Sequence, residues 1–429
     1  MKKVFSCGLL LVSAILFILG NGVNWILNET PLFREQQGTV FAQAVRSEPV
    51  VSVREFERVL TLQERQPIYM RTENLIQIGV LEAGQPVAIT GEDEAYYVLS
   101  LGKMAAFIPK GRGVVEKQKV LPSVYTERFA SVETLETTTV YAEADLESGA
   151  LLQLEAGYRY PVVQEIEDWY IIKIGERPGY IHKQSITLDT GVPVLVYHQV
   201  LPRAMMQTTM STISLESFEQ QMGYLADQQF TTLTSQQLYD YLEGRLVVPS
   251  QAIVITFDDG LVSAKDYAYP VLQKYGFTAP HHMISSRMDR EKGAPAFDGG
   301  GLLTYLTAAD LDKMKDVFQF EAHTSELHEL NHATNLGVVF DHTQDEIAAD
   351  LLENLKKVPT AVSIAYPYGQ YNEQFIAAAK EVGLLIGYTT VEGYATMDTS
   401  NYEVNRFGMT EKRSFEQFAT YVDGDMTWP

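Results

Sequence analysis

The chain has 429 residues, of which 46% are hydrophobic and 21% are charged, a balance that excludes an intrinsically disordered protein. This length exceeds that of a usual single hydrophobic core, so we expect two or three domains. The formal net charge of -22 repels phosphate backbones and argues against a nucleic-acid partner.

Residues 1–27 have the features of an export signal. Lys2 and Lys3 precede an almost uninterrupted apolar run over residues 4–20, and residues 23–27 prolong it. The run is long enough to span a bilayer, so we expect a signal anchor with the lysines inside and the rest of the chain outside the cell membrane. A cleaved signal peptide, which would give a secreted protein, is the alternative. The single cysteine, Cys7, lies in this segment, so the exported part is expected to have no disulfide.

An internal repeat follows a linker that we place at residues 28–57. The two copies are offset by 72 or 73 residues, which is too regular for chance. Residues 66–70, 81–84, 94–98 and 106–110 correspond to residues 138–142, 154–157, 167–171 and 179–183. In each copy short apolar-polar alternations are broken by glycines or acidic turns, which predicts a small all-β domain.

The second copy resembles the bacterial SH3-like domain. Tyr141, Trp169 and Tyr180 stand where that family has its aromatic residues, and the first copy is a weaker match. We therefore predict SH3-like repeats at residues 58–113 and 136–188, with a linker at 114–135. The resemblance implies contact with cell-wall material, although the same aromatic residues are equally suited to a hydrophobic core.

From residue 193 to residue 425 the pattern changes to apolar runs that alternate with helices. The runs 194–197, 253–257, 317–320 and 362–366 are short and continuous, as buried parallel strands are. Helices are expected from Ser214, from about Asp345, and from Asn372 to Gly383. Their inward residues are predicted to be Phe218, Met222 and Leu225 in the first and Ile347, Leu351, Leu352 and Leu355 in the second. The fold class is thus α/β, and the size suits an irregular (β/α) barrel.

Each of the four apolar runs ends in polar or turn-forming residues. These are His198, then Asp258-Asp259-Gly260, then Glu321-Ala322-His323, and finally Pro367-Tyr368-Gly369. The carboxyl ends of parallel strands in such barrels meet at one rim, where active sites are built. The four endings together therefore predict a single functional site.

Asp258 and Asp259 indicate a metal site within this rim. Adjacent carboxylates repel each other unless one is neutralised, and a metal ion bound to one of them leaves the other free as a base. His323 and His328 can join the site only if the chain turns between them, because neither a strand nor a helix places residues five apart on one face. Two imidazoles and one carboxylate form a common ligand set for Zn²⁺ or a similar divalent ion.

These residues also carry a resemblance to the NodB-type polysaccharide deacetylases, carbohydrate esterase family 4. Residues 256–260, Thr-Phe-Asp-Asp-Gly, resemble the first motif of the family, and residues 323–328 resemble its second motif lengthened by one residue. Residues 366–369 resemble the third motif, although Tyr366 replaces its usual arginine. No histidine follows His342 to supply the family's late acid, but His198 precedes the Asp pair, as in the permuted poly-N-acetylglucosamine deacetylase branch.

The resemblance implies a metal-dependent N-deacetylase that acts on a polysaccharide containing N-acetylglucosamine. Asp259, His323 and His328 would hold the metal, Asp258 would act as base and His198 as acid. Tyr368 would stabilise the oxyanion, and Tyr366, Pro367 and Gly369 would complete the substrate-binding motif. His281 and His282 are interpreted as structural. The alternatives are a non-catalytic glycan-binding scaffold and an O-acetyl esterase.

Overall fold

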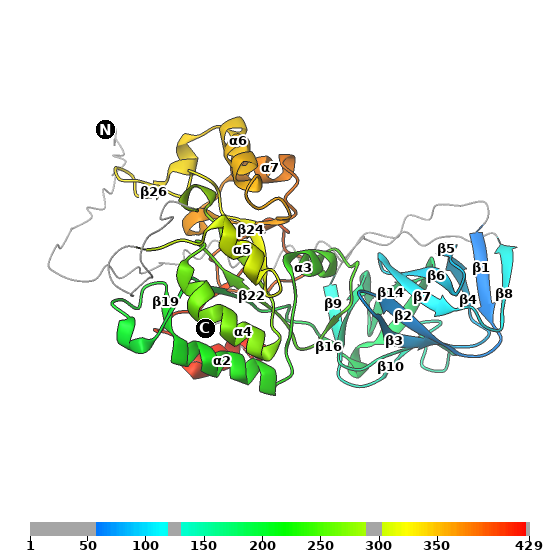
Figure 1. Cartoon of the computed structure of the whole chain (residues 1–429). Helices are drawn as coiled ribbons and strands as arrows, with labels where there is room; N and C mark the ends of the chain where they lie inside the picture. The colour runs from blue at the N-terminus through cyan, green and yellow to red at the C-terminus, as the bar shows by residue number, and fades with distance from the viewer. Residues whose placement is uncertain (1–56, 119–129, 289–302, 426–429) are drawn as a thin grey trace, which may run out of the picture. The chain divides into compact units, whose positions relative to one another are not determined.

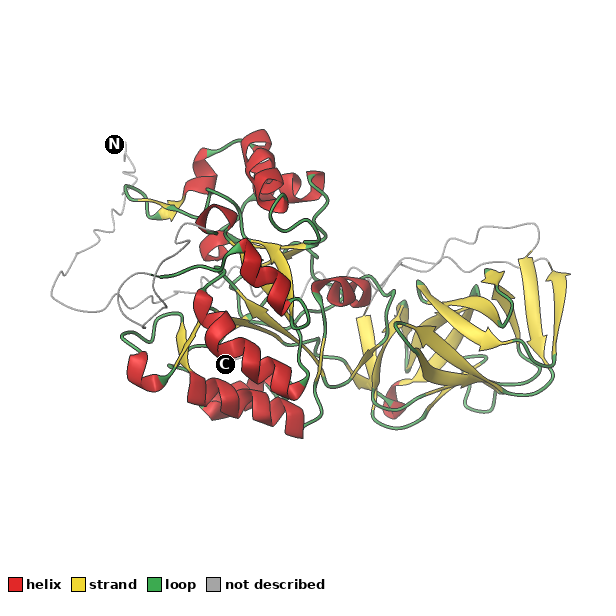
Figure 2. Cartoon of the chain, in the orientation of Figure 1, coloured by secondary structure: helices red, strands yellow, loops and turns green. Residues whose placement is uncertain are grey.

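The computed structural model describes residues 57–118, 130–288 and 303–425, drawn in colour in Figure 1. The predicted signal segment 1–27 lies outside these ranges, as does nearly all of the linker 28–57. Among the described helices, none is long and apolar enough to cross a membrane. The described chain consists of a strand-rich region up to residue 188 and an α/β domain after it (Figure 2).

The predicted repeat is visible in the strands, because the two copies have the same order of elements. The first copy contains β1 (Glu57–Leu62), β2 (Gln66–Arg71), β3 (Leu75–Leu81), β4 (Pro86–Ile89), β5 (Gly91–Glu92), β6 (Tyr96–Leu101), β7 (Met104–Pro109) and β8 (Gly113–Gln118). The second contains β9 (Ala130–Thr134), β10 (Thr138–Tyr141), β11 (Ala150–Leu154), β12 (Tyr158–Val162), β13 (Gln164–Ile166), β14 (Trp169–Ile174), β15 (Arg177–His182) and β16 (Thr187–Leu188). Strand pairings are repeated as well: β2 pairs with β3 and β7 in the first copy, as β10 pairs with β11 and β15 in the second.

The two copies share one sheet. Strand β3 pairs with β11, so the strands form a ten-stranded sheet in the order β13-β14-β15-β10-β11-β3-β2-β7-β6-β5. One hydrophobic cluster contains buried residues of both copies, such as Leu81 and Leu154. The predicted linker at 114–135 is wrong in its bounds, because β8 and β9 both lie largely within it. The SH3-like character of each copy stays a prediction.

Parallel strands form the centre of the α/β domain. The main path of the sheet is β28-β27-β24-β23-β22-β17-β29, and β20 (Thr231–Thr232) pairs with β22. The strands of the path are β17 (Val194–Tyr197), β22 (Ala252–Phe257), β23 (Ala279–Met283), β24 (Phe318–Ala322), β27 (Ser363–Ala365), β28 (Ile386–Tyr388) and β29 (Phe407–Gly408). A parallel bridge between Tyr388 and Val404 brings the β28 end towards the segment that leads into β29. The predicted barrel is therefore present in an irregular, barrel-like form.

Helices flank this sheet (Figures 1 and 2). They are α2 (Leu215–Asp227), α3 (Ser235–Leu242), α4 (Tyr269–Tyr275), α5 (Ala308–Met314), α6 (Gln344–Leu355), α7 (Glu373–Glu381) and α8 (Phe415–Val422). Ser214 caps α2 by accepting a hydrogen bond from the Ser217 amide, and its predicted inner face is buried. Helix α7 begins after Asn372 and Gly383 follows it with a φ of 89°, also as predicted.

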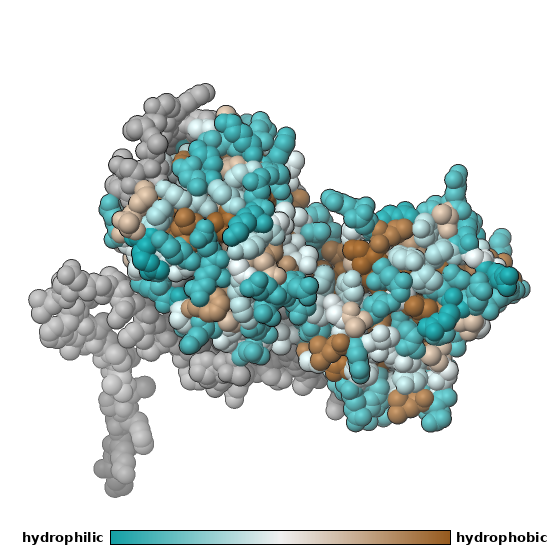
Figure 3. All heavy atoms as spheres, turned by 60° about the horizontal axis from the view of Figure 1, so that its bottom comes forward, coloured by the Kyte–Doolittle hydropathy of each residue, from teal (hydrophilic) through white to brown (hydrophobic). Residues whose placement is uncertain are grey.

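One predicted inward residue of α6 is wrong. Ile347 and Leu351 are buried, whereas Leu352 is 52% exposed. Leu352 follows Leu351 directly and is rotated about 100° from it on the helix, so both cannot face the same core. On the face drawn in Figure 3, hydrophilic side chains cover most of the coloured surface.

Candidate active site

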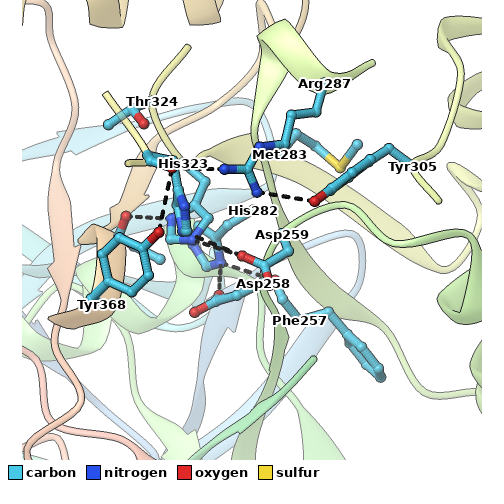
Figure 4. Close-up of polar contacts among 12 residues, drawn as sticks. Phe257, Asp258, Asp259, His282, Met283, Arg287, Tyr305, His323, Thr324 and Tyr368 are labelled. Carbon is cyan, nitrogen blue, oxygen red and sulfur yellow. Dashed lines mark hydrogen bonds and ion pairs between the residues drawn. The ribbon is translucent and has the colours of Figure 1, made fainter. Parts of the chain in front are cut away.

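The carboxyl ends of neighbouring strands carry the predicted site residues. His198 follows β17, Asp258 and Asp259 follow β22, and His323 follows β24. Strand β17 pairs with β22 in parallel, and β23 lies between β22 and β24 and is parallel to both. The carboxyl ends of these strands therefore lie at the same edge of the sheet. Figure 4 shows the side chains of Asp258, Asp259 and His323 pointing towards one another.

Asp259, His323 and His328 form a compact group of metal-ligating atoms. One ligand atom from each residue lies within 4.8 Å of the others. The Nε2 atoms of His323 and His328 are each 3.4 Å from Asp259 Oδ1. Asp259 adopts a φ of 74°, a left-handed conformation that aspartate tolerates better than most residues and that turns its carboxylate into the group.

The protonation of the two imidazoles suits a bound cation. His323 Nδ1 is 2.7 Å from the carbonyl oxygen of Ala365, which can only accept, so Nδ1 carries the proton and Nε2 is the atom that faces Asp259. Burial lowers the pKa of His328 to about 3, which leaves its ring neutral. Ring lone pairs and a carboxylate oxygen that converge in this way repel one another unless a cation lies among them. The residues therefore fit a divalent metal ion.

A turn after β24 brings His328 back to the site. Thr324 has a φ of 63°, and the amides of Ser325 and Glu326 each donate to the Asp350 carboxylate at 2.7 Å. The expectation that the chain must turn between the two histidines is thus confirmed. Asp350 lies on α6, so the loop that carries His328 is fixed to a helix.

Asp258 is held by an arginine that the sequence did not reveal. Arg406 Nη1 donates to Asp258 Oδ1 at 2.9 Å, and Arg406 Nη2 donates to Oδ2 at 2.8 Å. The side chains of Arg406 and Asp258 are only 0% and 3% exposed. Burial alone would raise the pKa of Asp258, but Arg406 and His282 outweigh burial and hold the pKa well below its ordinary value.

The two carboxylates of the Asp pair consequently have different partners. Asp258 faces an arginine, whereas Asp259 faces histidines. Burial opposes ionisation of Asp259 too, but the neighbouring imidazoles, above all that of His323, outweigh burial and hold the pKa of Asp259 below its ordinary value. His198, the predicted acid, is half-buried and directly follows β17, the strand that pairs with β22.

The third predicted motif divides between the site and the core. Tyr368 is 43% exposed, has a φ of 57°, and its ring centroid is 4.6 Å from that of His328. Tyr366 is 1% exposed and its hydroxyl donates to the carbonyl of Tyr402 at 3.0 Å. The predicted substrate contact of the Tyr366 side chain is therefore wrong, because that side chain packs in the core.

The remainder of the motif forms the turn at the rim. Pro367 is buried, and Gly369 has a φ of 68°. A Cβ atom at Gly369 would lie 2.0 Å from Thr390 Oγ1, so only glycine fits there.

Arg287 is a second side chain that the sequence did not point to. Its guanidinium donates to the carbonyl of His328 at 2.7 Å and to the hydroxyl of Tyr305 at 3.0 Å (Figure 4). Arg287 therefore holds the backbone of His328 itself, whereas Asp350 holds the beginning of the same loop. No local pattern marks either Arg287 or Arg406, because each acts on residues far away in the sequence.

Two histidines and one carboxylate, grouped beside a second buried carboxylate at the carboxyl ends of parallel strands, are typical of hydrolases that use a divalent cation. The sequence profile of the polysaccharide deacetylase family matches residues 246–387. The matched residues all lie in the α/β domain.

Individual proteins are also similar to about half of the chain. A putative polysaccharide deacetylase, YxkH of Bacillus subtilis, is 28% identical over 235 residues, which are 54% of this chain and 76% of the relative. The poly-β-1,6-N-acetyl-D-glucosamine N-deacetylase of Staphylococcus epidermidis is 28% identical over 221 residues, which are 50% of this chain and 73% of that enzyme. The structure of IcaB from Ammonifex degensii is similar with a TM-score of 0.47 at 24% identity, over 55% of this chain and 97% of IcaB.

Proposed function

We propose that the protein removes N-acetyl groups from N-acetylglucosamine residues of an extracellular polysaccharide. The observation that carries the proposal is the group of Asp259, His323 and His328 next to the buried carboxylate of Asp258. Its relatives in Bacillus and Staphylococcus, described as deacetylases of polysaccharide and of poly-β-1,6-N-acetyl-D-glucosamine, support the substrate class.

Asp259, His323 and His328 would hold the divalent ion, for which Zn²⁺ is our first choice because of the two imidazole ligands. Such an ion, when bound, polarises an acetamide carbonyl and lowers the pKa of a coordinated water. The hydrogen bond from His323 Nδ1 to Ala365 orients its ring for this role.

The chain's own groups supply the proton transfers. Asp258, ionised and fixed by Arg406, accepts the proton that the attacking water loses. The backbone N–H of Tyr368, a 43% exposed residue at the rim, donates to the carbonyl oxygen as negative charge develops there. His198 donates a proton to the departing amine, so that the products are acetate and a free glucosamine residue.

We further propose that residues 1–27 anchor the protein in the cell membrane and that the duplicated β region contacts the cell wall. The basic and apolar pattern of the first segment supports the former. The half-buried aromatic residues Tyr141 and Tyr180, which pack edge-on against Trp169, support the latter.

The test is acetate release by the full chain from purified wall and biofilm glycans, with and without a chelator. We expect release from a polymer of N-acetylglucosamine, loss of release with chelator, and recovery on addition of Zn²⁺. Asp258→Asn should abolish release while metal content stays near normal. Release only from O-acetylated glycans, or turnover by Asp258→Asn equal to that of the wild type, would refute the proposal.

A further inference from the structure

His282 is a buried histidine next to the site, and both of its ring nitrogens have partners. It lies on β23 and is 0% exposed. Its Nδ1 is 3.1 Å from Asp258 Oδ1 and 3.3 Å from the carbonyl oxygen of Phe257, and its Nε2 is 3.0 Å from Ser363 Oγ. Figure 4 shows the ring of His282 beside Asp258.

The partners fix the direction of these hydrogen bonds. Both neighbours of Nδ1 are oxygens that can only accept, so Nδ1 carries a proton. Burial lowers the pKa of His282, so the ring is neutral and Nε2 is an acceptor for the Ser363 hydroxyl. Ser235 donates to Ser363 Oγ at 3.1 Å, so the proton of Ser363 is available for the ring or for the Glu321 carboxylate, which also bonds to Ser363.

These bonds make the two oxygens of Asp258 unequal. Oδ1 accepts from Arg406 at 2.9 Å and from His282 at 3.1 Å, so both of its in-plane lone pairs are occupied. Oδ2 accepts only from Arg406, at 2.8 Å, among the contacts of the described residues. One lone pair of Oδ2 therefore remains for a proton from another molecule.

From this geometry we infer that His282 is a positioning residue, which fixes the rotation of the Asp258 carboxylate so that Oδ2 is the atom that takes the proton from water. The inference rests on the proposed role of Asp258 as base. In the transfer, a water O–H bond breaks and an O–H bond forms at Oδ2. The hydroxide oxygen bonds to the carbonyl carbon of the acetamide as the C=O π bond breaks and its electron pair moves to the carbonyl oxygen. Arg406 alone does not determine which oxygen of Asp258 takes the proton, because it donates one hydrogen bond to each of them.

The neighbouring histidine provides a matched control on the same strand. His281 is also 0% exposed, but neither of its ring nitrogens has a hydrogen-bond partner. Its ring packs among Phe257, Phe318 and Phe320. His281 and His282 are thus alike in residue type, strand and burial, and differ in whether they reach Asp258.

The test compares two amides at position 282 in the full-length, metal-loaded protein. An asparagine side chain can place its N–H near the position of Nδ1, whereas a glutamine reaches the position of Nε2. With an oligomer of N-acetylglucosamine as substrate, we expect His282→Gln to lower kcat by about 10- to 100-fold at unchanged KM and metal content, because the base is no longer oriented. His282→Asn should recover most of this loss, and the control His281→Leu should keep the wild-type kcat.

The outcomes separate this inference from the proposed function. Equal kcat losses for the two amides would mean that His282 has only a structural role, and wild-type kcat in His282→Gln would also overturn the inference. If both variants fail to fold, Ser363→Ala decides, with a several-fold lower kcat expected and an unchanged kcat contradicting it. Wild-type turnover by Asp258→Asn would instead remove the proposed function itself.

Discussion

Removing either partner of the ion pair between Arg406 and Asp258 should lower the free energy of unfolding, because the other charge then stays buried without a partner. Arg406→Met leaves a carboxylate that is 3% exposed without its partner. Removing one partner of such a buried pair costs about 3–5 kcal/mol, because the remaining charge is neither hydrated nor neutralised. Asp258→Asn leaves the buried guanidinium in the same position, so it should also destabilise the fold.

The double variant, with both substitutions, decides whether the unpaired buried charge causes the loss of stability in each single variant. It contains neither charge, so its loss of unfolding free energy should be smaller than the sum of the two single losses by roughly 3 kcal/mol. Urea unfolding followed by far-ultraviolet circular dichroism is suitable, since the described α-helices all lie in the α/β domain. A chelator should be present throughout so that metal binding does not add to the stability. Additive losses, within about 0.5 kcal/mol, would refute the reasoning.

Three further substitutions test other features of the site. Asp350→Ala frees the amides of Ser325 and Glu326 and should weaken metal binding about 10- to 100-fold in a chelator competition. Asp350→Asn should weaken metal binding less. Equal metal affinities for Asp350→Ala and the wild type would contradict this reasoning. Burial raises the pKa of Glu321 to about 7 from an ordinary 4.5, so the unfolded chain releases this proton at lower pH than the native state does. As the pH rises between those two values, the free energy of unfolding therefore falls by up to about 1.4 kcal/mol per pH unit. Glu321→Gln removes this loss, so the variant should gain stability relative to the wild type across that pH window in denaturant titrations, and a constant difference would show that Glu321 is not the cause. His281→Met removes two buried nitrogens without partners and should raise the free energy of unfolding by about 1–3 kcal/mol, whereas a lower value would mean that the ring has a partner.

Much of the site could be predicted because its residues follow strands in the sequence. The strands that end before Asp258 and His323 are short and rich in apolar residues, and parallel topology alone brings such ends together. The turn required between His323 and His328 is also a local property, since it depends on residues between them. For the same reason the helix boundaries at Ser214 and Asn372 were predicted from single capping residues.

Residues that act across long sequence separations could not be predicted in this way. Arg406 is 148 residues from Asp258 and lies next to β29, which has two residues and no recognisable period. His282 was interpreted as structural because its sequence neighbours are ordinary strand residues, and only its position beside Asp258 in space suggests another role. Tyr366 was assigned to the substrate by its motif, but the direction of its side chain depends on the core around Phe375 and Tyr371.

The pairing of β3 with β11 has the symmetry of an interface between identical subunits. Leu81 pairs with Leu152, and Gly79 pairs with Leu154. At the 73-residue offset of the repeat, Leu154 is equivalent to Leu81 and Leu152 is equivalent to Gly79. Exchanging the two copies therefore converts each pair into the other. The centre of the ten-stranded sheet is therefore an approximate twofold axis, across which each copy presents the same strand to the other. A single copy would expose this strand as an unpaired edge and would form a dimer through it. Joining two copies in one chain keeps that association at every protein concentration, since the partner is always attached.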